Sequence, residues 1–197
     1  MRTVCVFCGS REGARPSYAE AARLVGKTLA RRGIGVVYGG GRVGLMGAVA
    51  DAVLEEGGEV VGVIPEALLA REIAHQGLTK LHVVGSMHER KRLMAGLSEG
   101  FVTLPGGYGT FEEFLEVLSW AQLGIHGKPC GLLDVDGYYE PLAILFDEAV
   151  KEGFVPPHHR PLVLMKRDPE SLLDAMVRYT PPKTNKWVGS GISERNL

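Results

Sequence analysis

Residues 101–123 read FVTLPGGYGTFEEFLEVLSWAQL, and this stretch indicates the fold. Residues 101–104 form a largely apolar run, which is typical of a strand in a parallel sheet that is covered on both faces. A glycine-rich turn follows, and residues 110–123 then place apolar side chains at helical spacing. A buried strand, a tight turn and a helix form the repeating unit of an α/β domain.

The same order of elements recurs along the whole chain. The apolar patterns predict further strands at residues 4–8, 35–38, 60–64, 81–84, 130–135 and 162–165. They predict further helices at residues 18–32, 45–55, 86–99, 139–152 and 169–179. This alternation predicts a doubly wound, mostly parallel sheet in a Rossmann-like three-layer α/β sandwich. We expect a single domain over residues 1–180 and a loosely held tail at 181–197.

The composition is that of a globular protein without an extended cationic surface. Apolar residues make up 45% and charged residues 23% of the chain, and the net charge is −1. This balance gives no long-range attraction to nucleic acid or to an anionic membrane, so neither is an expected partner. No apolar run has the length of a membrane span, and the N-terminus lacks the pattern of a signal peptide. We therefore expect a cytoplasmic protein.

The cysteines and histidines indicate neither a redox pair nor a metal site. Cys5 and Cys8 have CxxC spacing, but the period of two in a strand puts their side chains on opposite faces. The three cysteines are an odd number, which suits reduced thiols, and the six histidines show no ligand spacing. We expect structural cysteines, no metal and no cofactor.

Three predicted strands end in turns of small or polar residues, at positions 8–10, 39–41 and 105–110. In a parallel sheet these turns share the edge at which ligands bind. Glycine lets backbone N–H groups approach an anion, and a following helix adds unpaired N–H groups and the positive end of its dipole. One such turn can be merely a tight connection. Three on one edge favour a phosphate site that includes Gly9, Ser10, Gly40 and Gly41.

Two other kinds of nucleotide site fit the sequence less well. Residues 39–44 read GGGRVG, which is a GxGxxG pattern between a strand and a helix, and Glu66 lies about twenty residues farther on. However, this pattern does not follow the first strand, and Glu66 follows a proline. Both points disfavour NAD or FAD. The chain contains neither GxxxxGKS nor GxxxxGKT, so a P-loop is not expected.

Two cations interrupt the apolar face of the helix predicted at residues 86–99. Ser86 and Glu89 have the spacing of a capping box at its start. At about 100° per residue, Arg90 and Lys91 fall on one broad face with the apolar residues Met87, Met94 and Leu97. Long stems can cover a core while the charges reach water. A bound phosphate or carboxylate would instead explain both cations together.

A carboxylate stands out on the helix predicted at residues 110–123. The expected core stripe is Phe111, Phe114, Leu115 and Leu118, with Glu112 and Glu116 on a polar flank. Glu113 lies opposite the stripe beside Val117 and Trp120, so it borders either a cleft or a subunit contact. Alternatively, Thr110 and Glu113 form a capping box, which the spacing alone favours. Tyr108 could stack on a base or line the turn.

These residues resemble the Lonely Guy family. The family signature Pro-Gly-Gly-x-Gly-Thr-x-x-Glu is present at residues 105–113, and the Met-His-x-Arg-Lys context is present at residues 87–91. Further similarity covers residues 4–10, 37–41, 44–47 and 120–124. The resemblance extends from about residue 4 to residue 155 and does not include the tail.

The resemblance implies a phosphoribohydrolase that acts on cytokinin riboside 5′-monophosphates or AMP, with Arg90 and Glu113 as the catalytic pair. It also implies a homodimer in which helices of one subunit border the site of the other, a contact that Val117 and Trp120 could serve. Ser119 stands where the family commonly has threonine. The implied substrate contacts are Glu72, Met87, Arg90, Lys91, Gly106, Gly107, Tyr108, Gly109, Thr110, Phe111, Glu112 and Ser119.

The implied chemistry agrees with the residue types. Cleavage of an N-glycosidic bond builds positive charge on the ribose. An ionised Glu113 can stabilise that charge and orient or deprotonate water. Arg90 stays protonated, so its expected role is to keep Glu113 ionised and to position phosphate or ribose. The sequence identifies no acid for the leaving base.

Other functions remain open from the sequence. Glycine turns alone also fit a non-catalytic nucleotide or molybdenum-cofactor carrier, an NAD-dependent oxidoreductase or a nucleic-acid-processing Rossmann protein. The pairing of Arg90 with Glu113 favours an enzyme, and the charge balance disfavours nucleic acid. Many members of the resembled family are labelled lysine decarboxylase, but the sequence contains no convincing attachment site for pyridoxal phosphate.

Overall fold

The computed structural model describes residues 1–69 and 74–182. Within them, a parallel sheet of seven strands has the order β4-β3-β2-β1-β5-β6-β7. The predicted α/β class is therefore confirmed. The strands are β1 (Thr3–Phe7), β2 (Gly35–Tyr38), β3 (Val60–Pro65), β4 (Lys80–Val84), β5 (Phe101–Thr103), β6 (Cys130–Leu133) and β7 (Val163–Lys166).

The chain reverses its direction of winding at β1. It proceeds outward from β1 through β2 and β3 to β4, and then returns to place β5 on the other side of β1. The carboxyl ends of β1 and β5 therefore form the topological switch point. Ligands of open α/β sheets bind in the crevice outside this point.

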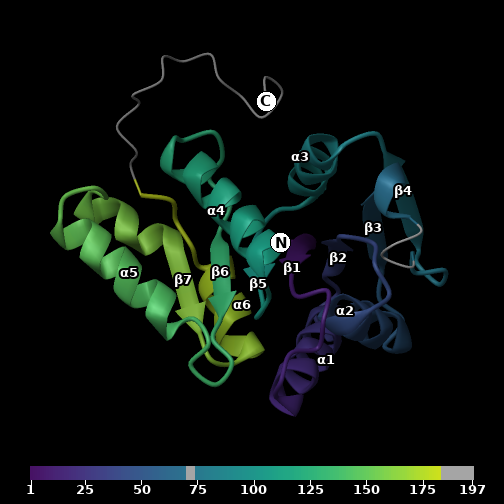
Figure 1. Ribbon diagram of the computed structural model, residues 1–197. Helices are drawn as coiled ribbons and strands as arrows, with labels where there is room; N and C mark the ends of the chain where they lie inside the picture. The colour runs from purple at the N-terminus through teal and green to yellow at the C-terminus, as the bar shows by residue number, and fades with distance from the viewer. Residues whose placement is uncertain (70–73, 183–197) are drawn as a thin grey trace.

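Helices cover both faces of the sheet (Figure 1). One layer packs on the core formed by Val4, Val6 and Val36, and it consists of α1 (Pro16–Arg31), α2 (Gly44–Glu55) and α6 (Pro169–Val177). The other packs on the core formed by Cys5, Phe7 and Val37, and it consists of α3 (Met87–Leu97), α4 (Tyr108–Gln122) and α5 (Glu140–Lys151). The three-layer sandwich is thus present as predicted.

The pleat of β1 separates the two cysteines of the CxxC pattern. Cys5 packs in the core under α3 and α4, whereas Cys8 packs in the core under α1 and α2. Burial raises the pKa of both thiols, and the nearby negative charge of Glu113 raises it further. Protonated thiols on opposite faces can form neither a redox pair nor a chelate, so the structural role predicted for them holds.

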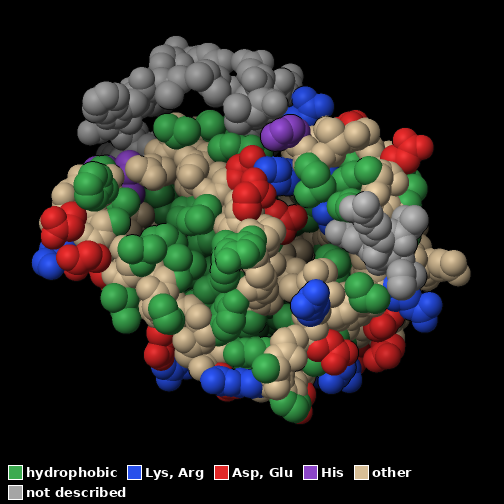
Figure 2. Space-filling view, in the orientation of Figure 1, with side chains coloured by type: hydrophobic (Ala, Val, Ile, Leu, Met, Phe, Trp, Pro, Cys, Tyr) green, Lys and Arg blue, Asp and Glu red, His purple; other side chains and the backbone are tan. Residues whose placement is uncertain are grey.

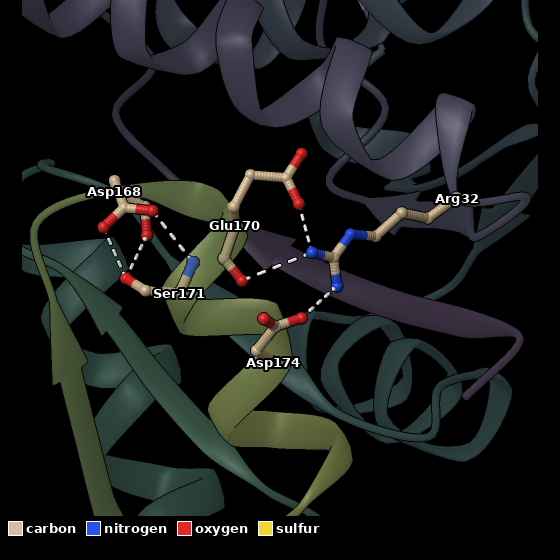
Figure 3. A network of polar contacts seen from close by, with 5 residues as sticks. All are labelled: Arg32, Asp168, Glu170, Ser171 and Asp174. Carbon is tan, nitrogen blue, oxygen red and sulfur yellow. Dashed lines mark hydrogen bonds and ion pairs between the residues drawn. The ribbon is translucent and has the colours of Figure 1, made fainter.

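A polar network joins the end of α1 to α6 (Figure 3). The Arg32 guanidinium donates to Asp174 Oδ1 at 2.8 Å and also bonds Glu170. Asp168 is the N-cap of α6 and accepts the Ser171 N–H at 2.8 Å. These bonds fix α6, and with it the outer part of one layer, to the helix that follows β1.

The structure adds two short elements, and α1 and α4 each begin two residues before their predicted starts. The 3-10 helices η1 (Glu66–Leu68) and η2 (Pro157–Leu162) were not predicted, because such short segments show no apolar period. Across 1–69 and 74–182, no helix combines the length and the apolar character needed to cross a membrane. The predicted tail from residue 183 lies outside the described residues.

Candidate active site

The glycine turns after β1, β2 and β5 meet at the switch point. The Gly9 N–H donates to Pro105 O at 3.0 Å, which joins the turns after β1 and β5. The Leu45 N–H donates to Gly9 O at 3.0 Å, which joins the first turn to the start of α2. The prediction that these turns share one edge is therefore confirmed.

A cavity of about 280 Å³ lies at this edge. Arg90 and Glu113 both line it, so the structure brings the expected catalytic pair to one site. The other expected residues that line it are Ser10, Met87, Gly107, Tyr108, Gly109, Thr110 and Glu112. A second cavity, of about 610 Å³, adjoins it across the glycine turn, and Gly9 and Gly106 line that one.

The start of α4 offers backbone N–H groups to the first cavity. Gly107 is the N-cap, and no side chain of the described residues caps this helix. The Thr110–Glu113 capping box is therefore wrong as an alternative, because Thr110 is already the third residue of the helix. No hydrogen bond in the described part of the chain uses the N–H groups of residues 106–110. Such N–H groups at the positive end of a helix dipole are suited to bind an anion.

Arg90 is built into the sheet edge rather than extended into solvent. Its side chain is 5% exposed. Nε donates to Val63 O at 3.0 Å, and Nη2 donates to Gly39 O at 2.7 Å. Two carbonyls, one just after β2 and one within β3, thus hold the guanidinium beside the cavity. The alternative that the stem of Arg90 covers the core while its charge reaches water is therefore wrong, because the guanidinium itself is buried.

Hydrogen bonds at the start of α3 fix the helix that carries Arg90. The Glu89 N–H donates to Ser86 Oγ at 3.1 Å, and the Glu89 carboxylate accepts the Gly85 N–H at 2.9 Å. The predicted capping interaction is therefore present, with the second bond made one residue earlier than in a standard box. Met87 and Met94 both line the cavity, but Met87 is 42% exposed whereas Met94 is buried in the core under α3 and α4.

The face of α4 that packs on the sheet differs from the predicted stripe. Phe114 and Val117 are buried, whereas Leu115 is 40% exposed. Phe111 and Leu118 are only partly buried. The true core face also includes Thr110 and Ala121, so it is rotated toward Val117. Glu113 lines the cavity, which agrees with the cleft that was one of the two alternatives predicted for it.

Lys91 is buried but does not line the cavity. Its Nζ donates to Glu116 Oε1 at 2.9 Å and also bonds Glu112. Burial alone lowers the pKa of Lys91, but the hydrogen bonds to the two carboxylates outweigh this effect and raise the pKa above its usual value. In this structure Lys91 therefore orients Glu112, which does line the cavity.

Several other predicted contacts lie away from the cavity. Gly40 packs against β3 and β4, and Gly41 bridges to Ala74. Phe111 packs against the rings of Tyr138 and Tyr139. The Ser119 hydroxyl donates to Leu115 O at 2.7 Å on the exposed side of α4. Glu72 lies outside the described residues.

The cavity also contains residues that were not predicted from the sequence. Gly39 lines the cavity in place of Gly40 and Gly41, and Cys8, Met46, Leu68 and Met94 complete its apolar wall. The sequence did predict a ligand-binding turn at residues 39–41. Three consecutive glycines left open which one faces the ligand, and the structure places Gly39 there. Nothing in the apolar spacing distinguished the other four from ordinary core residues.

A larger cavity at the opposite edge of the sheet does not compete as an anion site. It has a volume of about 710 Å³ and lies among the ends of α1, α2 and α3. The carbonyl ends of helices carry partial negative charge, which repels an anion. None of the residues predicted for substrate binding lines it.

The family model described as "Possible lysine decarboxylase" matches residues 46–176. Curated relatives carry a different name. The chain is 54% identical to a probable cytokinin riboside 5′-monophosphate phosphoribohydrolase of Oryza sativa subsp. japonica, LOGL9, over 91% of this chain and 79% of that protein. It is 49% identical to the cytokinin riboside 5′-monophosphate phosphoribohydrolase LOG7 of Arabidopsis thaliana, over 91% of this chain and 83% of that protein.

Solved structures with the same fold are more distant in sequence. The molybdenum cofactor carrier protein of Chlamydomonas reinhardtii matches with a TM-score of 0.69 at 21% identity, covering 90% of this chain and 96% of that one. The molybdenum cofactor binding protein of Rippkaea orientalis matches with a TM-score of 0.67 at 19% identity, covering 89% of this chain and 95% of that one. At these identities the likeness establishes the fold alone.

Proposed function

This chain belongs to the Lonely Guy family of phosphoribohydrolases, and we propose that it hydrolyses the N-glycosidic bond of nucleoside 5′-monophosphates. The products are the free base and ribose 5-phosphate. The proposed substrates are cytokinin riboside 5′-monophosphates and AMP. One observation carries the proposal: Arg90 and Glu113 line the same cavity as the uncapped start of α4.

The start of α4 and the glycine turn before it bind the 5′-phosphate. Their N–H groups supply donors without a protein partner among the described residues, and the helix dipole adds positive potential. Thr110 is 4% exposed and lines the cavity. A phosphate held here fixes the position of the ribose relative to Glu113, which lies one turn farther along the helix.

Glu113 is the catalytic carboxylate. It stabilises the positive charge that develops on the ribose and orients the attacking water. Arg90 keeps this carboxylate ionised, because a buried guanidinium beside the cavity favours the charged form of an acid. The walls formed by Cys8, Met46 and Met94 limit the access of water to the reacting bond.

We further propose that the protein is a homodimer. The family resemblance supports this, as do exposed apolar side chains on and after α5, since Ile144 is 68% exposed and Phe154 is 83% exposed. Figure 2 shows hydrophobic side chains gathered over the face that carries α4 and α5. Val117 is 3% exposed in the core of its own subunit, so it cannot serve the contact suggested for it.

The first test is turnover of AMP, followed by chromatography for adenine. We expect adenine from AMP and a far slower release from adenosine, because adenosine cannot use the phosphate site. Comparable rates from both substrates would overturn the phosphate site. A panel of monophosphates, including prenylated adenine nucleotides, then identifies the preferred base. The absence of any free base with intact binding would favour a nucleotide carrier instead.

The second test is Glu113→Gln. We expect this variant to bind AMP normally and to lose at least about 100-fold in kcat, which is the usual contribution of a positioned carboxylate. The matched control is Glu20→Gln, which makes the same change at an exposed position of α1, in the opposite layer. Near-normal turnover by Glu113→Gln would remove Glu113 from the mechanism.

A further inference from the structure

We propose that Tyr138 is a positioning residue that holds the glycine turn in its anion-binding conformation. Its hydroxyl donates to Gly106 O and thereby fixes the peptide that joins Gly106 to Gly107. The inference rests on the proposed function, because it assigns a role in binding the 5′-phosphate. Tyr138 lies after β6, far from the signature residues 105–113 in sequence.

Every carbonyl along the turn accepts a hydrogen bond from within the protein. Their donors are the Tyr139 hydroxyl to Leu104 O at 2.6 Å, the Gly9 N–H to Pro105 O at 3.0 Å, the Tyr138 hydroxyl to Gly106 O, and the Phe111 N–H to Gly107 O at 3.0 Å. The N–H groups of residues 106–110 have no such partner among the described residues. The turn is therefore polarised, with its acceptors used internally and its donors left for a ligand.

The geometry of the peptide bond links Tyr138 to the N–H of Gly107. In a trans peptide the carbonyl and the N–H point in opposite directions, and the described residues contain no cis peptide bond. Tyr138 lines the adjoining cavity and not the cavity of Arg90 and Glu113. When its hydroxyl holds the Gly106 carbonyl on that side, the Gly107 N–H is directed away from it, toward the catalytic cavity.

A glycine on each side of this peptide makes such a restraint necessary. Two successive glycines have the greatest backbone freedom of any pair, so the peptide between them can rotate at low cost. A rotated peptide would place the Gly106 carbonyl oxygen where the phosphate binds and would remove one N–H donor. The Tyr138 hydroxyl makes the rotated state unfavourable, because rotation breaks its bond to Gly106 O.

The ring of Tyr138 is itself held by aromatic neighbours. Its centroid lies 5.0 Å from that of Tyr139 and 5.8 Å from that of Tyr18, both in edge-to-face contact. It also stacks on Phe111 of α4 at 6.4 Å. Burial raises the pKa of Tyr138, with the Tyr18 hydroxyl adding to the effect, so the group stays a proton donor at neutral pH. These contacts persist when phenylalanine replaces tyrosine.

The test compares Tyr138→Phe with two matched variants. Tyr18→Phe removes a hydroxyl from the same aromatic cluster, and Tyr139→Phe removes the buried hydroxyl that binds Leu104 O. For Tyr138→Phe we expect about a tenfold rise in KM for AMP and in Kd for inorganic phosphate, which corresponds to one hydrogen bond. We expect kcat with AMP to change less than KM, and the slow reaction with adenosine to stay unchanged. Tyr18→Phe should match the wild type, and Tyr139→Phe should lower the melting temperature with phosphate affinity retained.

A spectroscopic measurement tests the same inference at the level of one N–H group. The amide resonance of Gly107 should shift when inorganic phosphate is added to the wild-type protein, and at the same phosphate concentration this shift should be smaller in Tyr138→Phe. The role of Tyr138 would be overturned if a folded Tyr138→Phe variant had the Kd and KM of the wild type. It would also be overturned if the Gly107 amide resonance of the wild type did not shift on addition of phosphate. A wild-type protein that binds phosphate but does not hydrolyse AMP would instead overturn the proposed function.

Discussion

At the scale of single residues, the site depends on a glycine that leaves room for a charged group. A Cβ atom added to Gly39 would lie 2.1 Å from Arg90 Nη2, which no rearrangement of the Cβ can avoid. Gly39 also supplies the carbonyl that Nη2 binds at 2.7 Å. The same residue therefore both admits the guanidinium and fixes it.

Gly39→Ala should thus lower activity by displacing Arg90. We expect at least about a tenfold loss in kcat/KM for AMP, since the guanidinium must leave its two carbonyls. The control is Gly96→Ala in α3, where an added Cβ would meet nothing within 4 Å. That change should preserve activity and raise the free energy of unfolding by up to about 1 kcal/mol, because alanine favours a helix over glycine. Equal activity of the two variants would contradict this account of Gly39.

Arg90→Lys tests whether the fork of the guanidinium matters beyond its charge. An ammonium cannot reach Val63 O and Gly39 O in the directions that Nε and Nη2 take. We expect kcat/KM to fall at least about tenfold, and the free energy of unfolding to fall by about 1–3 kcal/mol because buried carbonyls lose their donor. Thermal unfolding and AMP turnover measure the two effects. Arg92→Lys, on the exposed side of the same helix, should change neither.

At the scale of elements, helix starts decide what the helices can do. Helix α3 begins with a side-chain cap at Ser86, and α6 begins with one at Asp168. Helices α1, α2, α4 and α5 begin without a side-chain cap, and the N-cap of α4 is Gly107. Where capping side chains are present, the first N–H groups are satisfied within the protein. Only an uncapped start can offer those groups to a ligand, and α4 does so at the switch point of the sheet.

The cap of α6 has a consequence for the pH dependence of stability. Hydrogen bonds from the Ser171 side chain and N–H lower the pKa of Asp168. A carboxyl with a lowered pKa in the folded state stabilises the fold above its unfolded pKa, and this contribution is lost as the pH falls through the folded value. Asparagine also caps helices but carries no charge. Asp168→Asn should therefore destabilise the protein at pH 7, and the difference from wild type should shrink below about pH 4. Chemical denaturation at pH 7 and pH 3 measures this, and a constant difference would contradict it.

The strand and helix pattern could be predicted from the sequence, but the rotation of α4 could not. Apolar runs and helical spacing identified each strand and α-helix found in residues 1–69 and 74–182, because burial in a layered sheet imposes those periods. The spacing of α4 fits two stripes equally well. The choice between Leu115 and Val117 depends on how the preceding turn directs the helix, which begins at Tyr108, two residues before the predicted start. That turn is set by long-range bonds to Tyr138 and Gly9, which no local pattern contains.

For the site, too, the sequence identified the unusual residues but not their partners in the fold. Arg90 and Glu113 stood out because charges interrupted apolar faces, and the structure places both at one cavity. Lys91 stood out for the same reason, yet its charge is used by Glu112 and Glu116. A buried cation needs an acidic partner, but spacing cannot tell whether that partner belongs to the protein or to a ligand.

At the scale of the whole molecule, the exposed apolar face is the feature that a single chain does not explain. Ile144 and Leu145 are 68% and 62% exposed on α5, and no residue of this helix is fully buried. Exposed apolar side chains that gather on one face mark a surface for association. A two-fold contact there would bury the same face of both copies, and it would lie on the layer that also carries α4 and the site.

If the proposed dimer forms through this face, Ile144→Glu should convert it to a monomer. A charge buried at the centre of a two-fold interface has no partner and faces its own copy, which is strongly unfavourable. Light scattering should give the mass of two chains for the wild type and of one chain for the variant. The control is Leu24→Glu, an equally drastic change at a 50% exposed position on α1, in the opposite layer. It should leave the mass unchanged.

A wild type that scatters as one chain would rule out the dimer, and an Ile144→Glu variant that stays dimeric would show that the interface lies on another face. If the partner borders the site, the monomeric variant should also lose AMP turnover while its thermal unfolding stays cooperative.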